Sequence, residues 1–254
     1  MGTIDPQKNK TTQTSFQVLD GLVRLNGGGV TDLAQDLGMP KSTVYKHLAT
    51  LRDIGYVKKD GSTYDLGAKF VELNDATLRE YRLYRVGQTN VEQLARATGD
   101  VVGLFIEEND RGIDLFRIRG NYASKNDITF INSHHLHASA AGKAILSQLS
   151  EERRGKILDR NELPQLTEDT ITDRAELIEQ LEVIRDRGVA FECGEQQRSY
   201  HSIATPISSS DTVLGSIYVA GPPDRLSTPR MRQDLAMTLG TTARDIERRL
   251  ADNE

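Results

Sequence analysis

Apolar residues recur at helical spacing in three short segments near the start of the chain. This pattern predicts helices over residues 15–25, 31–37 and 40–54. Thr31 is placed to cap the free amides of the second helix, and Gly38 supplies the left-handed residue that ends it. Because a short turn separates the second helix from the third, the two are expected to form a helix-turn-helix.

The third predicted helix has one apolar and one polar side. Its apolar stripe consists of Val44, Leu48 and Leu51. At about 100° per residue, the opposite side carries Ser42, Lys46 and Thr50, flanked by Thr43, Tyr45 and Ala49. No carboxylate lies on this polar side, so it can enter a major groove and reach phosphates and base edges without electrostatic repulsion.

A basic hairpin is predicted over residues 56–66, around an Asp60-Gly61 turn, with Lys58 and Lys59 near its tip. Helix, turn, helix and hairpin in this order indicate a winged helix-turn-helix. The residues expected to contact DNA are Thr31, Lys41, Ser42, Thr43, Tyr45, Lys46, Thr50, Lys58 and Lys59. Two alternatives stay open: the basic residues can form a solvated face, and Tyr45 can pack on the surface.

Residues 68–85 predict a further helix, rich in apolar and aromatic side chains and free of Pro and Gly. A helix of this composition, following so small a domain, needs a partner surface. We expect the partner to be the same helix of a second subunit, which would make the protein a homodimer. The alternative is that the helix packs on the domain that follows it.

Beyond residue 86 the pattern changes to mixed helices and strands. Strands are predicted over 101–107, 113–119, 128–132, 189–192, 202–207 and 213–220. Helices are predicted over 86–98, 137–149, 174–187 and 228–250, the last capped by Ser227 or Thr228. Short connections favour a mainly antiparallel sheet flanked by helices, so the predicted fold class is α+β. The expected organisation is a polar leader (1–14), a winged helix domain (15–67), a linker or dimerisation helix (68–85) and a second domain (86–254).

Composition narrows the class of protein. A chain of 254 residues is long enough for two domains, each with its own core. The single cysteine, Cys193, excludes a disulfide framework and suits a reducing compartment. The longest apolar runs, such as 101–106, fall far below the roughly 20 residues of a membrane span, and the N-terminus is polar. We therefore expect a cytoplasmic protein with no membrane partner.

Catalytic signatures are missing from the sequence. It has no Gly-rich phosphate loop after a strand, no Gly-x-Ser-x-Gly elbow and no His-Glu-x-x-His motif. His134, His135, His137, Cys193 and His201 could gather around a metal, although their spacing matches no strong metal signature. The prediction is a protein that is not an enzyme and has no cofactor or bound metal, with a metal sensor as an alternative.

Four segments, in order, resemble the IclR family of transcriptional regulators. The first two are Pro-Lys-Ser-Thr-Val-Tyr-Lys-His-Leu-Ala-Thr-Leu at 40–51 and His-Ala-Ser-Ala-Ala-Gly-Lys-Ala-Ile-Leu at 137–146. The third is Ile-Arg-Asp-Arg-Gly-Val-Ala at 184–190, continuing to Glu195 and to Ile-Ala-Thr-Pro-Ile at 203–207. The fourth is Gly221-Pro222. Together they span almost the whole chain.

This resemblance implies a winged helix joined by a linker helix to a GAF-like effector-binding domain. It implies dimers, or dimers of dimers, on palindromic operators in double-stranded DNA, with small metabolites as effectors, often carboxylic or aromatic acids. Carried over by position, the effector-binding residues are Ala140, Ala141, Gly142, Glu192, Tyr200, Ser202, Tyr218 and Ala220. The predicted function is a transcriptional regulator whose operator affinity is coupled to a small metabolite. The alternative is a metabolite-binding or metal-sensing protein whose N-terminal helices mainly dimerise.

The chain departs from the family pattern around this pocket. Tyr218 and Ala220 stand where the family often has small hydroxyl residues, and Ser199 stands where it usually has glycine. Arg198 and His201 make the neighbouring loop more basic. A basic loop is compatible with an anionic effector, but Arg198 can equally point to solvent.

Overall fold

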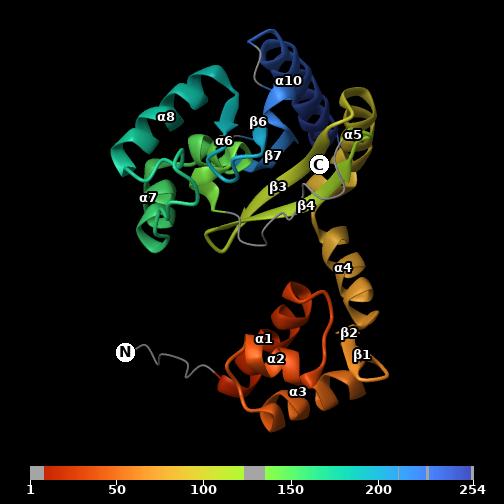
Figure 1. The fold of residues 1–254 in the computed structure, drawn as a ribbon. Helices are drawn as coiled ribbons and strands as arrows, with labels where there is room; N and C mark the ends of the chain where they lie inside the picture. The colour runs from red at the N-terminus through yellow and green to blue at the C-terminus, as the bar shows by residue number, and fades with distance from the viewer. Residues whose placement is uncertain (1–8, 123–134, 211, 227–228, 253–254) are drawn as a thin grey trace, which may run out of the picture. The chain divides into compact units, whose positions relative to one another are not determined.

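The computed structural model describes residues 9–122, 135–210, 212–226 and 229–252, without the side chains of 229–232. Contacts between residues divide the chain into two compact units, one ending at Glu80 and the other beginning at Tyr81 (Figure 1). None of the described helices combines the length and apolar character that crossing a bilayer requires.

The N-terminal unit is a three-helix domain followed by a hairpin and a further helix. Its elements are α1 (Lys10–Arg24), α2 (Val30–Asp36), α3 (Lys41–Asp53), β1 (Val57–Asp60), β2 (Thr63–Leu66) and α4 (Lys69–Glu80). Leu33 of α2 is fully buried against Val44 and Leu48 of α3. The apolar stripe predicted for the third helix is therefore confirmed as the side that meets the first two helices.

Three local expectations in this unit are wrong. Helix α1 begins at Lys10, because Asn9 caps it by accepting from the Thr12 N–H at 3.1 Å, so part of the expected polar leader is helical. Thr31 is not the cap of α2: Gly29 is, and its N–H donates to the Asp32 carboxylate at 3.0 Å. The hairpin turn is Gly61-Ser62, one residue later than expected, because Asp60 still pairs with Thr63.

The helix expected over 68–85 is interrupted. Helix α4 ends at Glu80, and Tyr81 has an extended backbone (φ −83°, ψ 107°) that starts a new helix, α5 (Arg82–Thr98). The Tyr81 hydroxyl donates to the Glu108 carboxylate at 2.7 Å, within the C-terminal unit. The break depends on this contact with a distant strand. The apolar periodicity continues through Tyr81 and therefore does not reveal the break.

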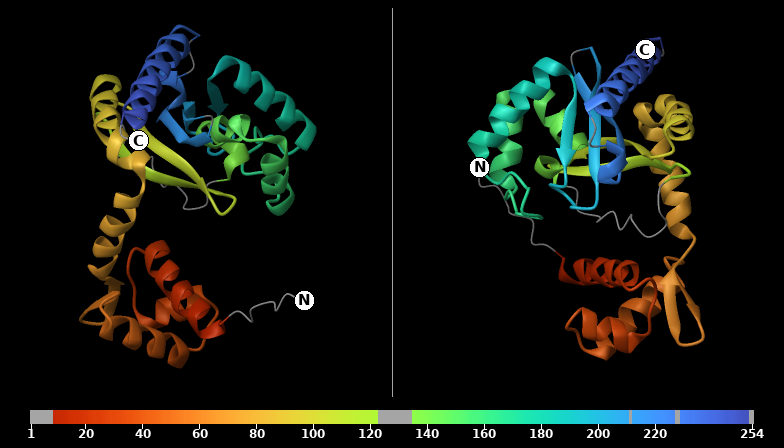
Figure 2. Two further views of the ribbon diagram at one scale, coloured as in Figure 1. Left: turned by 180° about the vertical axis from the view of Figure 1, so that it is seen from behind. Right: turned by 45° about the horizontal axis from the view of Figure 1, so that its top comes forward.

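The C-terminal unit is a five-stranded antiparallel sheet with helices on both faces (Figures 1 and 2). Its strands are β3 (Val101–Glu108), β4 (Arg111–Arg119), β5 (Ala190–Cys193), β6 (His201–Ser209) and β7 (Thr212–Gly221), in the order β4-β3-β7-β6-β5. Helices α5 and α10 (Pro229–Ala251) contact one face of the sheet, and α6 (Ala140–Gln148) contacts the other, with α8 (Arg174–Arg187) packed on α6. The α+β class and the mainly antiparallel sheet are confirmed.

Several elements of this unit differ from the expected ones. The 3₁₀ turn η1 (Leu136–Ala138) precedes α6, and α7 (Glu151–Arg160) and α9 (Pro223–Leu226) were not predicted. The connection between β3 and β4 is a two-residue turn, Asn109-Asp110, with φ of +54° and +66°, and not a five-residue loop. The strand expected over 128–132 and the caps Ser227 and Thr228 lie outside the described residues.

Candidate functional site

The polar side of α3 is open to solvent in the N-terminal unit. Ser42, Lys46 and Thr50 are exposed, as the sequence predicts, and Tyr45 is 55 % exposed. Lys41 is also exposed, whereas Thr43 is half-buried. The burial pattern therefore places hydroxyl, phenol and ammonium groups on one accessible surface, which can donate to phosphate oxygens and base edges.

Contacts from other elements fix the position of α3. Ser15 Oγ of α1 lies 2.9 Å from Nδ1 of the half-buried His47, and Leu48 is buried in the core beside it. The sequence interpretation did not assign His47 a role, although a polar residue beside an apolar stripe signals a hydrogen bond across two helices.

The hairpin is attached to the loop that precedes α2. Tyr64 of β2 exchanges two backbone hydrogen bonds with Gly28, at 2.9 and 3.0 Å, and its side chain is only 2 % exposed. Lys58 and Lys59 of β1 are exposed, and Lys59 Nζ lies 5.4 Å from the centre of the Tyr64 ring. The two cations therefore stand on a strand whose orientation relative to α2 is set by backbone pairing.

Three of the predicted effector residues form a row across the sheet of the C-terminal unit. Glu192 of β5 pairs with Ser202 of β6, which pairs with Ala220 of β7. Directly paired residues of antiparallel strands point to the same face, and here that face packs against α6. Ser202 Oγ donates to the Glu192 carboxylate at 3.1 Å. We refer to Glu192, Ser202 and Ala220 as the sheet row.

The small residues at the start of α6 have a structural reason. An added Cβ at Gly142 would lie 2.3 Å from the Leu136 carbonyl oxygen, so η1 occupies the space beside the helix. Ala140 and Ala141 are also buried, and the Ala141 carbonyl accepts from Ser216 Oγ at 3.0 Å. The small residues on this side of α6 therefore make room for the chain itself.

Tyr218 occupies the middle of the same sheet face. It is 4 % exposed, and its hydroxyl donates to Asp114 Oδ1 at 2.7 Å. Its ring packs on Gly103, where an added Cβ would approach it to 2.7 Å. A pocket in this domain is therefore smaller than it would be with the family's small hydroxyl residues at this position.

The basic loop does not bring positive charge to the sheet row. Arg198 is exposed and pairs with the exposed Glu168 at 2.7 Å. Lys143 of α6 is fully buried, but both carboxylate oxygens of Glu195 lie 2.5 Å from its Nζ. The sequence interpretation noted Glu195 only as part of a family motif. A lysine within the apolar helix α6 is the signal that could have revealed a buried ion pair.

Burial raises the pKa of Glu192 to about 7, because the charged carboxylate loses water, although hydrogen bonds from the Gln196 N–H and Ser202 Oγ oppose the shift. The row therefore holds a carboxyl group that titrates near neutral pH. It can accept hydrogen bonds when charged and donate one when protonated.

This shift makes the stability of the C-terminal unit depend on pH. With a folded-state pKa above the unfolded value of 4.5, the contribution of Glu192 is complete below pH 4.5 and is lost as pH rises to about 7. Glu192→Gln is therefore expected to be more stable than wild type at pH 8, by about 3 kcal/mol, and equal to it near pH 4.5. Thermal unfolding at both values measures this. The exposed Glu162 provides the control, since Glu162→Gln should match wild type at both. Equal stability of Glu192→Gln and wild type at pH 8 would contradict the assignment.

The residues considered for a metal do not come together. Cys193 and His201 are cross-strand neighbours, whereas Nε2 of His137 lies 3.2 Å from the Pro164 carbonyl oxygen. Across the part of the chain that the structure describes, no three His, Cys, Asp or Glu side chains are grouped for a metal ion. His134 lies outside that part.

A winged helix-turn-helix joined to an α+β domain with a small polar row on its sheet defines a two-domain DNA-binding regulator. The family model "Bacterial transcriptional regulator IclR C-terminal" matches residues 75–248, and "IclR helix-turn-helix domain" matches residues 13–61. The chain belongs to the IclR family of bacterial transcriptional regulators. Members of this family are regulators and not enzymes, which agrees with the prediction from motifs.

Individual relatives match this chain over nearly its full length. The protein described as "Probable HTH-type transcriptional regulator ArcR" of Halobacterium salinarum is 29 % identical, with 97 % of this chain and 95 % of that protein covered. KdgR of Escherichia coli is also 29 % identical, with 91 % and 89 % covered. The crystal structure of Thermotoga maritima IclR superposes with a TM-score of 0.77 at 24 % identity, covering 94 % of this chain and 98 % of that one.

Proposed function

We propose that the exposed side of α3 enters the major groove of an operator and that the hairpin contacts its phosphates. The observation that carries this proposal is the exposure of Ser42, Lys46 and Thr50 on a helix side without a carboxylate. Lys41, Thr43 and Tyr45 extend the same contact surface, and Thr31, exposed in the first turn of α2, faces the phosphate backbone.

Helix α4 supplies the means to dimerise. None of its residues is buried, and Val71 and Leu73 are 62 % and 43 % exposed. Apolar side chains in this number on one helix fit a second copy of the same helix. A two-fold dimer presents two copies of α3, so its operator is a palindrome with half-sites about one helical turn, or a multiple of it, apart. Such dimers can pair further into tetramers.

The effector is proposed to bind the sheet face that carries Glu192, Ser202 and Ala220, beside Tyr218 and the buried Tyr200. An anionic effector finds no unpaired cation on this face among the described residues, since Arg198 and Lys143 pair with acidic partners. The row favours a compact ligand that donates a hydrogen bond to Glu192. An IclR homologue from Microbacterium hydrocarbonoxydans has been crystallised with 4-hydroxybenzoate, which carries such a hydroxyl together with a carboxylate.

The effector changes operator affinity only if it binds the free and DNA-bound arrangements of the protein unequally. A coupling of about 1–3 kcal/mol would change operator affinity roughly 5- to 150-fold.

The cheapest test is a gel shift of the purified chain on the DNA upstream of its own gene. A discrete, competitor-resistant complex supports the proposal. The rival function, in which the N-terminal helices only dimerise a metabolite-binding or metal-sensing protein, predicts a dimer that gives no such complex.

The hairpin cations are expected to act on all DNA sequences alike. Lys58→Ala combined with Lys59→Ala should weaken binding to operator and random DNA to a similar degree, because phosphates carry no sequence information. The slope of log affinity against log salt should fall by about 0.9 for each phosphate that the variant no longer neutralises. Fluorescence anisotropy across a salt series measures both. Loss of selectivity for the operator, with an unchanged salt slope, would instead show that the hairpin contacts base edges.

A further inference from the structure

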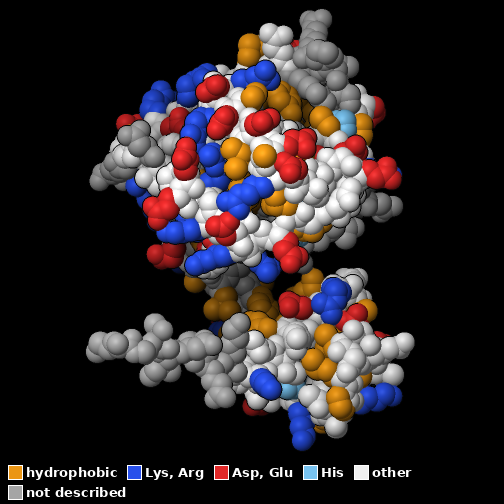
Figure 3. Space-filling view, turned by 90° about the vertical axis from the view of Figure 1, so that its left-hand side faces the viewer, with side chains coloured by type: hydrophobic (Ala, Val, Ile, Leu, Met, Phe, Trp, Pro, Cys, Tyr) orange, Lys and Arg blue, Asp and Glu red, His pale blue; other side chains and the backbone are white. Residues whose placement is uncertain are grey.

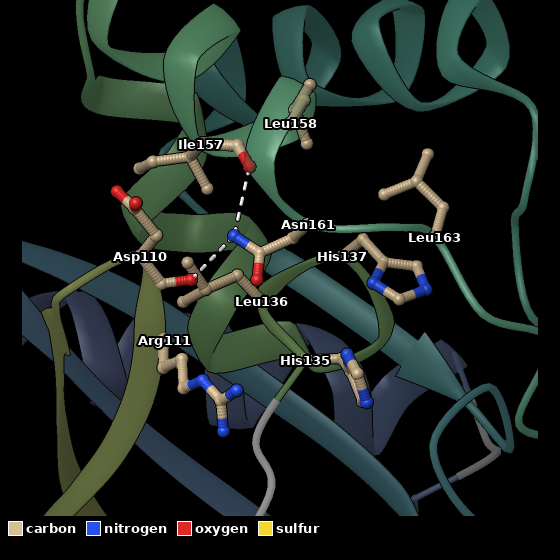
Figure 4. Close-up of a pocket in the computed structure, with 9 residues that line it drawn as sticks. All are labelled: Asp110, Arg111, His135, Leu136, His137, Ile157, Leu158, Asn161 and Leu163. Carbon is tan, nitrogen blue, oxygen red and sulfur yellow. Dashed lines mark hydrogen bonds between the residues drawn. The ribbon is translucent and has the colours of Figure 1, made fainter. Parts of the chain in front are cut away.

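A pocket lies at the far end of the β3–β4 hairpin. Its volume is about 290 Å³, just below the roughly 300 Å³ at which the range for small-molecule sites begins. The pocket is lined by the hairpin turn, by η1 and the residue before it, and by α7 and the segment after it: Asp110, Arg111, His135, Leu136, His137, Ile157, Leu158, Asn161 and Leu163 (Figure 4).

This hairpin-tip pocket is separate from the sheet row. None of the eight predicted effector residues lines it. On β3, Val101 pairs with Ala220 of the row, whereas Glu108 at the opposite end pairs with Arg111. At about 3.3 Å per residue, the length of the strand therefore separates the two places.

The walls of the pocket are apolar. Leu136, Ile157 and Leu158 are at most 7 % exposed and belong to the core, and Leu163 packs against the same cluster. Asn161 Nδ2 donates to the carbonyl oxygens of Asp110 and Ile157, each at 3.0 Å (Figure 4). These bonds join the hairpin turn to α7 and keep the pocket formed.

Three arginines lie at or beside the pocket, and two of them are held in ion pairs. The Asp110 carboxylate accepts from Arg153 at 2.7 Å and Arg160 at 3.1 Å, and Arg153 also pairs with Glu107 at 2.9 Å. These two acids and two arginines balance one another, and the arginines lower the pKa of Asp110.

Arg111, which lines the pocket, is exposed and forms no ion pair among the described residues. The carboxylate of its cross-strand neighbour Glu108 accepts from the Tyr81 hydroxyl and keeps its negative charge. On the face of the C-terminal unit that Figure 3 shows, acidic and basic side chains are interspersed.

The two imidazoles add polarity without charge. Burial lowers the pKa of His137 to about 4 and also lowers that of His135, so both rings are neutral at pH 7. His137 Nε2 is 3.2 Å from the Pro164 carbonyl, which can only accept. The proton is therefore on Nε2, and Nδ1 is left as an acceptor.

We propose that the hairpin-tip pocket binds a small monocarboxylate with a compact aromatic or branched apolar body. Its carboxylate pairs with the Arg111 guanidinium, and its body lies against Leu136, Ile157 and Leu158. A ligand held there touches both the hairpin turn and α7. It is a second site, distinct from the effector site proposed on the sheet row.

The test uses the purified full chain without DNA, so its outcome is independent of operator binding. Benzoate is titrated by calorimetry, with benzamide as the uncharged match. We expect saturable benzoate binding, at least about tenfold weaker in Arg111→Gln, because a charge-assisted bidentate pair is lost. Benzamide should bind wild type as weakly as benzoate binds this variant. Arg119→Gln, an exposed arginine at the other end of β4, is the matched control and should bind benzoate like wild type.

Two further variants locate the site. Leu163→Phe should abolish binding by filling the pocket, whereas Ser202→Ala on the sheet row should leave it unchanged. No saturable binding by wild type up to about 10 mM overturns the proposal. Binding that survives Arg111→Gln, or that is lost in Ser202→Ala, also overturns it and places the carboxylate elsewhere.

Discussion

Replacing Lys143 with methionine is expected to lower the free energy of unfolding of the C-terminal unit by about 3–5 kcal/mol. The Lys143 side chain is fully buried, and its Nζ lies 2.5 Å from both carboxylate oxygens of Glu195, which is 9 % exposed. Without the ammonium group, a buried carboxylate has no counter-charge. Lys143 lowers the pKa of Glu195 against the raising effect of burial, so the variant should also take up a proton at this site.

Urea unfolding followed by circular dichroism measures the effect of Lys143→Met. The exposed pair of Lys156 and Glu152 provides a control at the same nominal distance of 2.5 Å. Lys156→Met should change stability by less than about 1 kcal/mol. The double variant Lys143→Met, Glu195→Leu should recover most of the loss, because apolar replacement of a whole buried pair is often neutral. If Lys143→Met costs no more than Lys156→Met, the pair does not hold the loop after β5 to α6.

Lys46→Ala should weaken operator binding by about 1–3 kcal/mol per half-site, or roughly 5- to 150-fold. Lys46 is the cation at the centre of the exposed side of α3, opposite Val44 and Leu48. The matched control is Lys10→Ala, an exposed lysine of α1 that lies outside the proposed contact surface. Anisotropy titrations at moderate salt compare the three proteins. Unchanged affinity in Lys46→Ala, or an equal loss in Lys10→Ala, would contradict the assignment of this side of α3 to the DNA.

Helix α3 and its exposed side could be predicted from the sequence because the apolar spacing that defines them is local. The spacing of Val44, Leu48 and Leu51 fixes the buried stripe, and the opposite side follows from helix geometry. The sheet row depended on the family resemblance, since its members Glu192, Ser202 and Ala220 stand on three different strands and lie far apart in the chain.

What the sequence did not reveal depends on contacts between distant segments. Lys143 and Glu195 are 52 positions apart, and the hairpin-tip pocket combines a turn near residue 110 with a helix ending at Arg160. The need for glycine at position 142 likewise comes from the close approach of Leu136, which only the folded chain shows. The helix also breaks at Tyr81 without a local helix-breaking residue, because the Tyr81 side chain is bonded to Glu108 of β3.

In the proposed regulator, two copies of the exposed side of α3 read a palindromic operator. The most direct measurement is the affinity of the purified chain for its best-bound upstream fragment and for a scrambled fragment of equal length and composition, at physiological salt. We expect the operator to bind at least about 1,000-fold more tightly than the scrambled fragment, with two chains per palindrome. Equal affinity for the two fragments would contradict it.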